Sequence, residues 1–154
     1  MFVASQKLVE FDGSGKLWQL SQGEHFDVDF TEKVQQLVET SQSKVIHFTA
    51  TNCQCNTVAK EHIESVEKLA RQHGFNNVTV NVAEHQLLLD VIPATPAVAV
   101  FDDSGELIYL GPYSAGYSCN VGSGIVESYV SGKVGKTPSA TILSETKGCY
   151  CPLI

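Results

Sequence analysis

Hydrophobic residues recur along the chain with two spacings, one typical of strands and one typical of helices. Short β-branched and aromatic runs at 44–49 and 78–82 predict buried strands. Longer stretches at 30–38 and 58–70 repeat apolar residues at helical spacing, and Gly74 ends the second of these predicted helices. Weaker patterns predict short helices over 84–91 and 121–131 and a strand over 141–143.

Two segments show the pattern of a β-hairpin. The alternating runs 8–11 and 16–20 flank Asp12-Gly13-Ser14-Gly15, and the runs 98–101 and 107–110 flank Asp102-Asp103-Ser104-Gly105. Both connections consist of residues that tolerate tight turns. The similarity of FDGSGKLWQL to FDDSGELIYL is interpreted as shared turn chemistry rather than as an internal repeat.

The order of these elements predicts an α/β fold. Strands that alternate with helices favour a mixed central sheet with helices on both faces, to which the first segment adds an N-terminal β-hairpin. A length of 154 residues with 43% hydrophobic residues is typical of one domain. We assign residues 1–131 to this domain and residues 132–154, rich in Gly, Ser and Thr, to a C-terminal tail that we expect to be mobile.

Charge and hydropathy exclude two classes of partner. The net charge is −7 and the ten basic residues are scattered, which argues against a nucleic-acid binder. No run approaches the roughly 18–20 apolar residues of a transmembrane segment. Residues 1–6 also lack the charged start and apolar run of a secretory signal, so an export segment would lie outside this chain.

Four of the five cysteines form two Cys-x-Cys pairs, Cys53/Cys55 and Cys149/Cys151. The first pair lies between a predicted strand and a predicted helix, where unpaired N–H groups lower the pKa of a thiol. We expect Cys53 to be the more exposed and more reactive of the two thiols. A disulfide within the pair would close a very small, strained ring. Redox or metal chemistry is favoured here over buried structural thiols or a fixed bridge.

The other three cysteines are candidate relay residues. Cys119 precedes the last predicted helix and is either a buried spectator or a third redox partner. Cys149 and Cys151 lie in the predicted tail, so we expect them to exchange electrons with Cys53/Cys55; a static bridge pinned by the last three residues is the alternative. The histidines other than His47 are interpreted as structural or surface residues.

The segment VIHFTATNCQC, followed about forty residues later by IPATPAVAVFDDSGELIYLGPYS, resembles the thioredoxin superfamily over residues 44–131. The N-terminal hairpin is similar to that of the membrane-tethered, cytochrome-maturation type, and the whole resembles a bacterial branch of the superfamily. The resemblance implies a thioredoxin-like three-layer fold in which Cys53 is the nucleophilic cysteine and Cys55 the resolving one. It further implies a cis Thr95–Pro96 bond, where local sequence and base rates favour trans.

Three positions depart from the superfamily pattern. A single residue, Gln54, separates the two cysteines, and Asn52 replaces the aromatic residue before them. His47 stands six residues before Cys53, where thioredoxins keep a buried acid. His47 is therefore either a proton shuttle for the resolving cysteine or a core histidine bonded to a carbonyl group.

These residues predict a thiol–disulfide oxidoreductase that uses no cofactor, acts on a protein thiol or disulfide, and works with a redox partner protein. The alternative is a copper or zinc binding or delivery module in which Cys53 and Cys55 are two of the ligands and Cys119 or a histidine completes the site. A redox-inactive scaffold is a third possibility. The resemblance favours the periplasm, or the periplasmic side of a membrane, and leaves the cytoplasm open.

Overall fold

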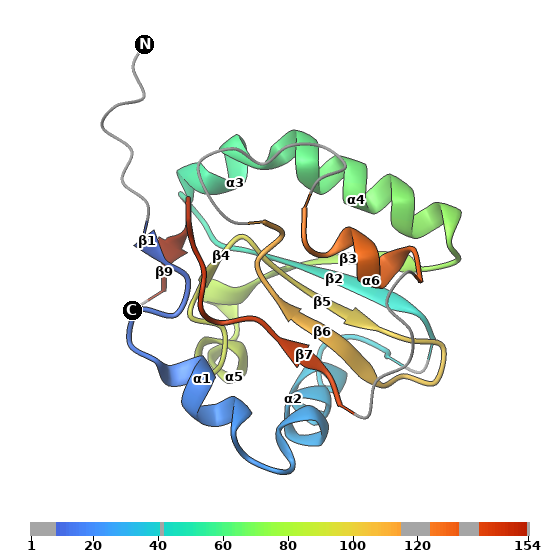
Figure 1. Ribbon diagram of the computed structural model, residues 1–154, viewed down its shortest axis with the longest axis horizontal. Coiled ribbons are helices and arrows are strands. Elements are labelled where there is room, and N and C mark those ends of the chain that lie inside the picture. Colours follow the sequence, from blue (N-terminus) through green and yellow to red (C-terminus); the bar gives the residue numbers. More distant parts are fainter. Residues whose placement is uncertain (1–8, 41, 115–123, 133–138, 154) are drawn as a thin grey trace.

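A five-stranded mixed sheet forms the centre of the computed structural model, which describes residues 9–40, 42–114, 124–132 and 139–153 (Figure 1). The strand order is β3-β2-β5-β6-β7. The five strands are β2 (Lys44–Thr49), β3 (Asn76–Asn81), β5 (Ala97–Phe101), β6 (Leu107–Gly111) and β7 (Thr141–Ile142). β2 pairs in parallel with β3 and β6 in parallel with β7, whereas β5 is antiparallel to both of its neighbours. The α/β class and the mixed sheet are as the sequence predicts.

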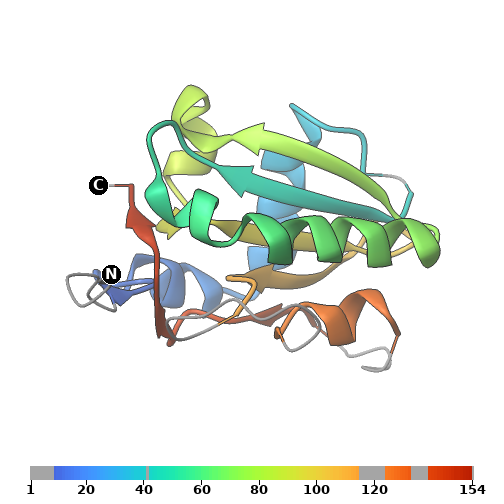
Figure 2. The ribbon, with the colours of Figure 1, turned by 90° about the horizontal axis from the view of Figure 1, so that it is seen from above.

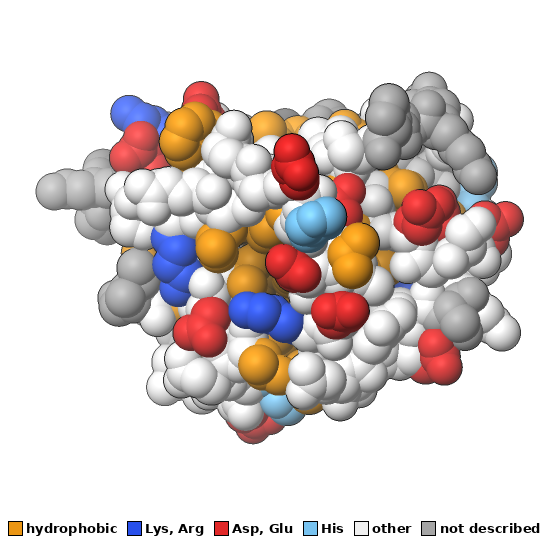
Figure 3. Space-filling view, turned by 90° about the horizontal axis from the view of Figure 1, so that it is seen from below, with side chains coloured by type: hydrophobic (Ala, Val, Ile, Leu, Met, Phe, Trp, Pro, Cys, Tyr) orange, Lys and Arg blue, Asp and Glu red, His pale blue; other side chains and the backbone are white. Residues whose placement is uncertain are grey.

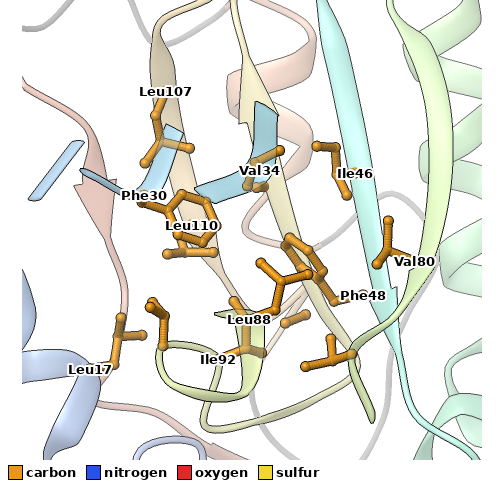
Figure 4. Close-up of a cluster of buried hydrophobic side chains, with 14 of the residues drawn as sticks. Leu17, Phe30, Val34, Ile46, Phe48, Val80, Leu88, Ile92, Leu107 and Leu110 are labelled. Carbon is orange, nitrogen blue, oxygen red and sulfur yellow. The ribbon is translucent and has the colours of Figure 1, made fainter. Parts of the chain in front are cut away.

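Helices cover both faces of this sheet (Figures 1 and 2). Alternation along β2 directs Ile46 and Phe48 to one core and Val45 to the other. The first core is closed by helices α1 (Lys16–Ser21), α2 (Phe26–Gln35) and α5 (Gln86–Leu89). Figure 4 shows how Phe30 and Val34 of α2 and Leu88 of α5 lie against strand residues in this core. Helices α4 (Lys60–Gln72) and α6 (Glu127–Val130) close the second core.

The predicted N-terminal hairpin is wrong. Residues 16–21 form helix α1, because the Asp12 carboxylate accepts hydrogen bonds from the backbone N–H groups of Leu17 and Trp18 at 3.1 and 2.8 Å. This side chain satisfies two of the N–H groups that a helix start leaves unpaired. The preceding strand, β1 (Val9–Glu10), pairs instead with β8 (Lys147–Gly148). The second predicted hairpin is present as β5 and β6.

The helices after β2 also differ from their predicted bounds. The helical pattern begins earlier, at Gln54, and is interrupted at Ala59, which separates α3 (Gln54–Val58) from α4. The predicted helix 84–91 is a short 3-10 turn, η2 (Val82–Glu84), followed by α5. Within the described residues the predicted helix 121–131 is reduced to α6, and residues 121–123 lie outside them.

The expectation of a mobile C-terminal tail is wrong for residues 139–153. The segment adds β7 to the edge of the sheet, pairs β8 with β1, and pairs β9 (Cys151–Pro152) with β4 (Ala94–Thr95). The backbone N–H of Ala140 also donates to the Asp27 carboxylate of α2 at 2.9 Å. In Figure 1 the segment runs from β7 toward the end of the molecule where α3 begins. Residues 139–153 are therefore part of the packed fold.

Acidic side chains are scattered among hydrophobic ones on the face shown in Figure 3. The Lys and Arg side chains described on that face form no broad basic patch. Across the residues that the structure describes, every helix is too short or too polar to cross a membrane.

Candidate functional site

The two Cys-x-Cys pairs meet and are joined by two disulfides. Cys53 is bonded to Cys151 and Cys55 to Cys149, with Cα–Cα distances of 5.8 and 5.5 Å. Both distances lie within the usual range for disulfides, roughly 4.4–6.8 Å. The expected bond between Cys53 and Cys55 is therefore not formed: each sulfur has a partner on the other segment, which avoids the strain of the small ring.

The first pair is positioned by the turn between β2 and α3. Cys53 is the N-cap residue of α3 with an extended backbone, and Cys55 lies in the first turn of this five-residue helix. Cys53 is buried, with 8% of its surface exposed, whereas Cys55 is half-buried. The expectation that Cys53 is the more exposed thiol is therefore wrong. Cys53 is buried because the segment around Thr95 packs against it: the Cys53 Sγ atom lies 3.6 Å from the Thr95 carbonyl oxygen.

Thr95 and Pro96 form the opposite wall of the site. The Thr95–Pro96 peptide bond is cis, in agreement with the implication of the sequence resemblance. Strand β4, which ends at Thr95, pairs antiparallel with β9 so that Thr95 lies opposite Cys151. The Leu153 N–H extends this contact by donating to the Pro93 carbonyl oxygen at 3.0 Å. The second pair is thus held beside the cis-proline loop by backbone hydrogen bonds.

Tyr150 anchors the second pair from within the motif. Its side chain is buried, with 7% exposed, and packs edge-on against Phe11 with ring centroids 5.2 Å apart. Its hydroxyl donates to the Ser114 carbonyl oxygen at 2.8 Å and lies 3.0 Å from the Thr146 hydroxyl oxygen. These contacts position Cys149 and Cys151 in addition to the two disulfides.

Two buried polar atoms beside the cysteines have no hydrogen-bond partner among the described residues. One is the Thr95 hydroxyl oxygen, in the residue whose carbonyl contacts Cys53, and the other is Oδ1 of Asn56, which directly follows Cys55. Buried polar groups are nearly always paired, so an unpaired one needs an explanation such as a redox role or a bound group. Of the two, the Thr95 hydroxyl can donate a hydrogen bond to a thiolate, whereas Asn56 Oδ1 can only accept one.

His47 is buried, and both of its ring nitrogens have partners. One ring nitrogen contacts the Tyr113 hydroxyl, and the other lies 2.9 Å from the Asn77 carboxamide oxygen. Burial lowers the pKa of His47, although its bond to Asn77 and the charge of Glu67 act in the opposite direction. Because both ring nitrogens are occupied, neither is available to a cysteine in this state. A role of His47 in exchange stays a prediction.

A second buried histidine was not expected to be part of a polar network. His62 of α4 is buried and its Nε2 lies 2.7 Å from a carboxylate oxygen of Glu127, which ties α4 to α6. Burial acts to raise the pKa of Glu127, but the hydrogen bond and charge of His62 outweigh it and hold this pKa below its usual value. The His62 ring lies 6.0 Å from that of Tyr113, which also stacks on His47. Its place on the apolar face of a predicted helix was the available sequence signal.

The remaining sequence candidates stay untested. Cys119 lies outside the described residues, so its relay and metal-ligand roles remain predictions. Within the described ranges, no three His, Cys, Asp or Glu side chains are grouped as a metal site. The four cysteines of the cluster are all in disulfides, and the thiolate rather than a disulfide sulfur is the metal ligand.

Comparisons with known proteins identify a family for the chain. A crystal structure of a hypothetical protein from Sinorhizobium meliloti 1021 is similar at 13% identity, with a TM-score of 0.46, over 74% of this chain and 80% of that chain. The sequence has no significant match among curated proteins. Residues 22–153 match the family described as a domain of unknown function, DUF6436. Because this match spans most of its length, the chain belongs to the DUF6436 family.

Proposed function

We propose that this protein is a thiol–disulfide oxidoreductase of the thioredoxin-like type in which two Cys-x-Cys pairs work together. The observation that carries the proposal is that Cys53/Cys55 and Cys149/Cys151 are bonded to each other beside the cis Thr95–Pro96 loop. The thioredoxin-like interpretation is supported by cysteines between a strand and a helix, with a cis-proline residue next to them. It is further supported by the hairpin β5–β6, which follows that proline.

The two sulfurs of the Cys53–Cys151 bridge differ in their exposure to solvent. Cys151 is half-buried and precedes the exposed Pro152, whereas its partner Cys53 is buried. Exchange depends on which sulfur an incoming thiolate can reach. Cys55 and Cys149 are half-buried as well, so exposure rules out only Cys53 as the first contact. We assign substrate entry to Cys151, which is bonded to Cys53 and precedes the exposed Pro152, and Cys53 is then the internal partner. This order differs from the one that the sequence resemblance implies, in which Cys53 meets the substrate first.

The exchange follows from these positions. A thiolate of a substrate dithiol attacks the Cys151 sulfur, the bond to Cys53 breaks, and Cys53 leaves as a thiolate. The second substrate thiolate then attacks the substrate sulfur of the mixed disulfide, which releases Cys151 and oxidises the substrate. Two electrons and two protons pass to the Cys53/Cys151 pair, and the reverse sequence reduces a substrate disulfide. The Cys55–Cys149 bridge provides a second two-electron couple next to the first.

Trapping of the mixed disulfide tests the proposal. The reduced full-length chain carrying Cys53→Ser is mixed with a disulfide-bonded peptide, and covalent adducts are located by mass spectrometry after proteolysis. We expect the peptide on Cys151, because the internal thiolate that would release it is missing. In Cys151→Ser we expect turnover of the peptide disulfide to be lost. The reaction assigned here does not use Cys119, so Cys119→Ser should turn over the peptide like the unmodified protein, and a loss of turnover would instead support the relay role predicted for Cys119.

Two results would contradict this assignment. Accumulation of the peptide on Cys53 in the Cys151→Ser variant would reverse the order of the two cysteines. Full turnover by a variant that lacks all four paired cysteines would remove exchange from the cluster altogether.

A further inference from the structure

We infer that the reduced protein has a second function at the same place, the binding of one zinc ion by the four thiolates of Cys53, Cys55, Cys149 and Cys151. The inference goes beyond the proposed exchange reaction and does not require it. It rests on the arrangement of the cysteines, their anchoring by other residues, and the unpaired Thr95 hydroxyl.

The arrangement brings four sulfurs together from two segments nearly one hundred residues apart. The bridges join positions separated by 98 and 94 residues, and both sulfurs of each pair face the other pair because each forms one of the bridges. Four thiolates around one point are the ligand set typical of structural zinc, with Zn–S bonds of about 2.3 Å. A tetrahedron of that size separates the sulfurs by about 3.8 Å. Within each bridge, where the Cα atoms are 5.8 and 5.5 Å apart, side-chain rotation after reduction can provide this separation.

The anchoring keeps the four residues together when the bridges open. Tyr150 stays fixed by its burial and by its hydrogen bond to Ser114, and β9 stays paired with β4. On the other side, β2 and α3 hold Cys53 and Cys55. A site organised before the ligand arrives loses less entropy on binding than one built from a mobile tail.

The unpaired Thr95 hydroxyl fits a ligand shell around thiolates. The Thr95 hydroxyl is fully buried and has no partner among the described residues, while the carbonyl of the same residue lies 3.6 Å from the Cys53 sulfur. A hydroxyl can donate a hydrogen bond to a metal-bound thiolate but gains little from a disulfide. Such outer-shell donors tune metal sites, and their loss typically lowers affinity by about 10- to 100-fold.

The loading reaction is balanced as follows. Two equivalents of a water-soluble phosphine break the two S–S bonds, two water molecules supply the oxygen of the phosphine oxides, and four thiols result. Zn²⁺ then replaces the thiol protons. Reoxidation by two equivalents of a two-electron oxidant of thiols, such as a diazenedicarboxamide, re-forms both disulfides and releases the metal ion.

The experiment uses the full chain, reduced by the phosphine under anaerobic conditions and given zinc chloride or cobalt chloride. After desalting we expect one zinc per chain by elemental analysis, and the cobalt form should show the absorption of tetrahedral thiolate coordination. Reoxidation should release the zinc to a chromogenic chelator. Cys119→Ser should bind like the unmodified chain, whereas Cys149→Ser/Cys151→Ser should lose stoichiometric zinc. Thr95→Val should weaken zinc binding by about 10- to 100-fold, and Thr95→Ser should restore it.

Several outcomes would overturn the inference. Zinc retained by the variant that lacks Cys149 and Cys151, but lost in Cys119→Ser, would assign the metal to the other predicted set of ligands. No stoichiometric zinc in the reduced, folded chain would remove the site altogether. Peptide-disulfide turnover is measured separately on metal-free protein, so a failure of zinc binding is distinguishable from a failure of the exchange proposal.

Discussion

The two Cys-x-Cys segments have the same spacing, but different parts of the molecule hold them in place. Cys53-Gln54-Cys55 continues from the central strand β2 into α3, and its middle residue, Gln54, is exposed. Cys149-Tyr150-Cys151 follows no long element, and its middle residue is buried against Phe11 and the Ser114 carbonyl. The first segment is positioned by its neighbours in the chain and the second by residues far from it in sequence.

This difference shows how a chain end becomes part of a site. The short strands of the C-terminal segment pair with β1, β4 and β6. The Tyr150 ring, between its two cysteines, packs into the first core. The disulfides then join two segments that are already adjacent. We therefore expect the anchoring and the sulfur chemistry to be separable, so that each can be removed without the other.

Removing both bridges should have the largest effect on stability. One crosslink across about 98 residues restricts the unfolded chain by about 4.7 kcal/mol. The second bridge closes a ring of only a few residues once the first exists, so the same relation gives roughly 2 kcal/mol for it. We expect Cys55→Ser/Cys149→Ser to lose the smaller amount and the variant that lacks all four cysteines to lose several times more.

Urea unfolding of these variants measures the effect, with Cys53→Ser/Cys151→Ser as the matched control, since it leaves the other bridge. Equal losses from one bridge and from both would show that anchoring, rather than crosslinking, restricts the tail.

Replacement of the two middle residues tests the comparison directly. Tyr150→Ala removes a buried ring and its hydrogen bonds and should cost about 3–5 kcal/mol of the free energy of unfolding. Gln54→Ala changes an exposed side chain and should stay within about 0.5 kcal/mol. Both are measured by urea unfolding of the phosphine-reduced protein, so that crosslinks do not contribute. Similar losses for the two variants would mean that the segments are supported alike.

The sequence was sufficient for the features that depend on local pattern. Lys44–Thr49 is a strand with the predicted bounds, since a β-branched and aromatic run of this length fits a central strand. Such local rules could not show that Tyr150 is an anchor, because Ser114 and Phe11, which it contacts, lie 36 or more positions away in the sequence. The pairing of the four cysteines could not be predicted either, because four cysteines allow three connectivities and local sequence does not choose among them.

The two similar segments FDGSGKLWQL and FDDSGELIYL show where local pattern fails. Asp12 uses its carboxylate to receive the N–H groups of Leu17 and Trp18 and so begins a helix. The Asp102 carboxylate accepts hydrogen bonds from the backbone N–H groups of Ser104 and Glu106, two and four positions later. The backbone N–H of Asp102 donates to the Glu106 carbonyl oxygen, and this bond closes a hairpin. The turn residues are nearly the same, and the paired strand that follows only in the second case decides the outcome.

The smallest expected effect is a pH dependence of the free energy of unfolding that arises from His47, on the strand that leads to Cys53. His47 lies on β2, the strand that leads to Cys53, and burial lowers its pKa below the usual 6.5. As the pH falls below about 6.5, the unfolded chain binds a proton at this position that the folded chain binds only at a lower pH. Stability is therefore present in full above that value and decreases as the pH falls toward the folded pKa.

His47→Gln retains hydrogen-bonding groups but does not titrate, so the stability of this variant should lack the decrease that His47 causes as the pH falls below about 6.5. Peptide-disulfide turnover of the variant, measured over the same pH range, tests whether His47 shuttles a proton. Glu127 provides the internal control. Because its folded pKa is lowered, the stability it contributes is lost only at more acidic pH, below its unfolded value of about 4.5, and this second decrease should persist in His47→Gln. Urea unfolding measured across both pH ranges separates the contribution of His47 from that of Glu127. An unchanged profile in His47→Gln would show that the support of the first pair does not depend on keeping His47 neutral.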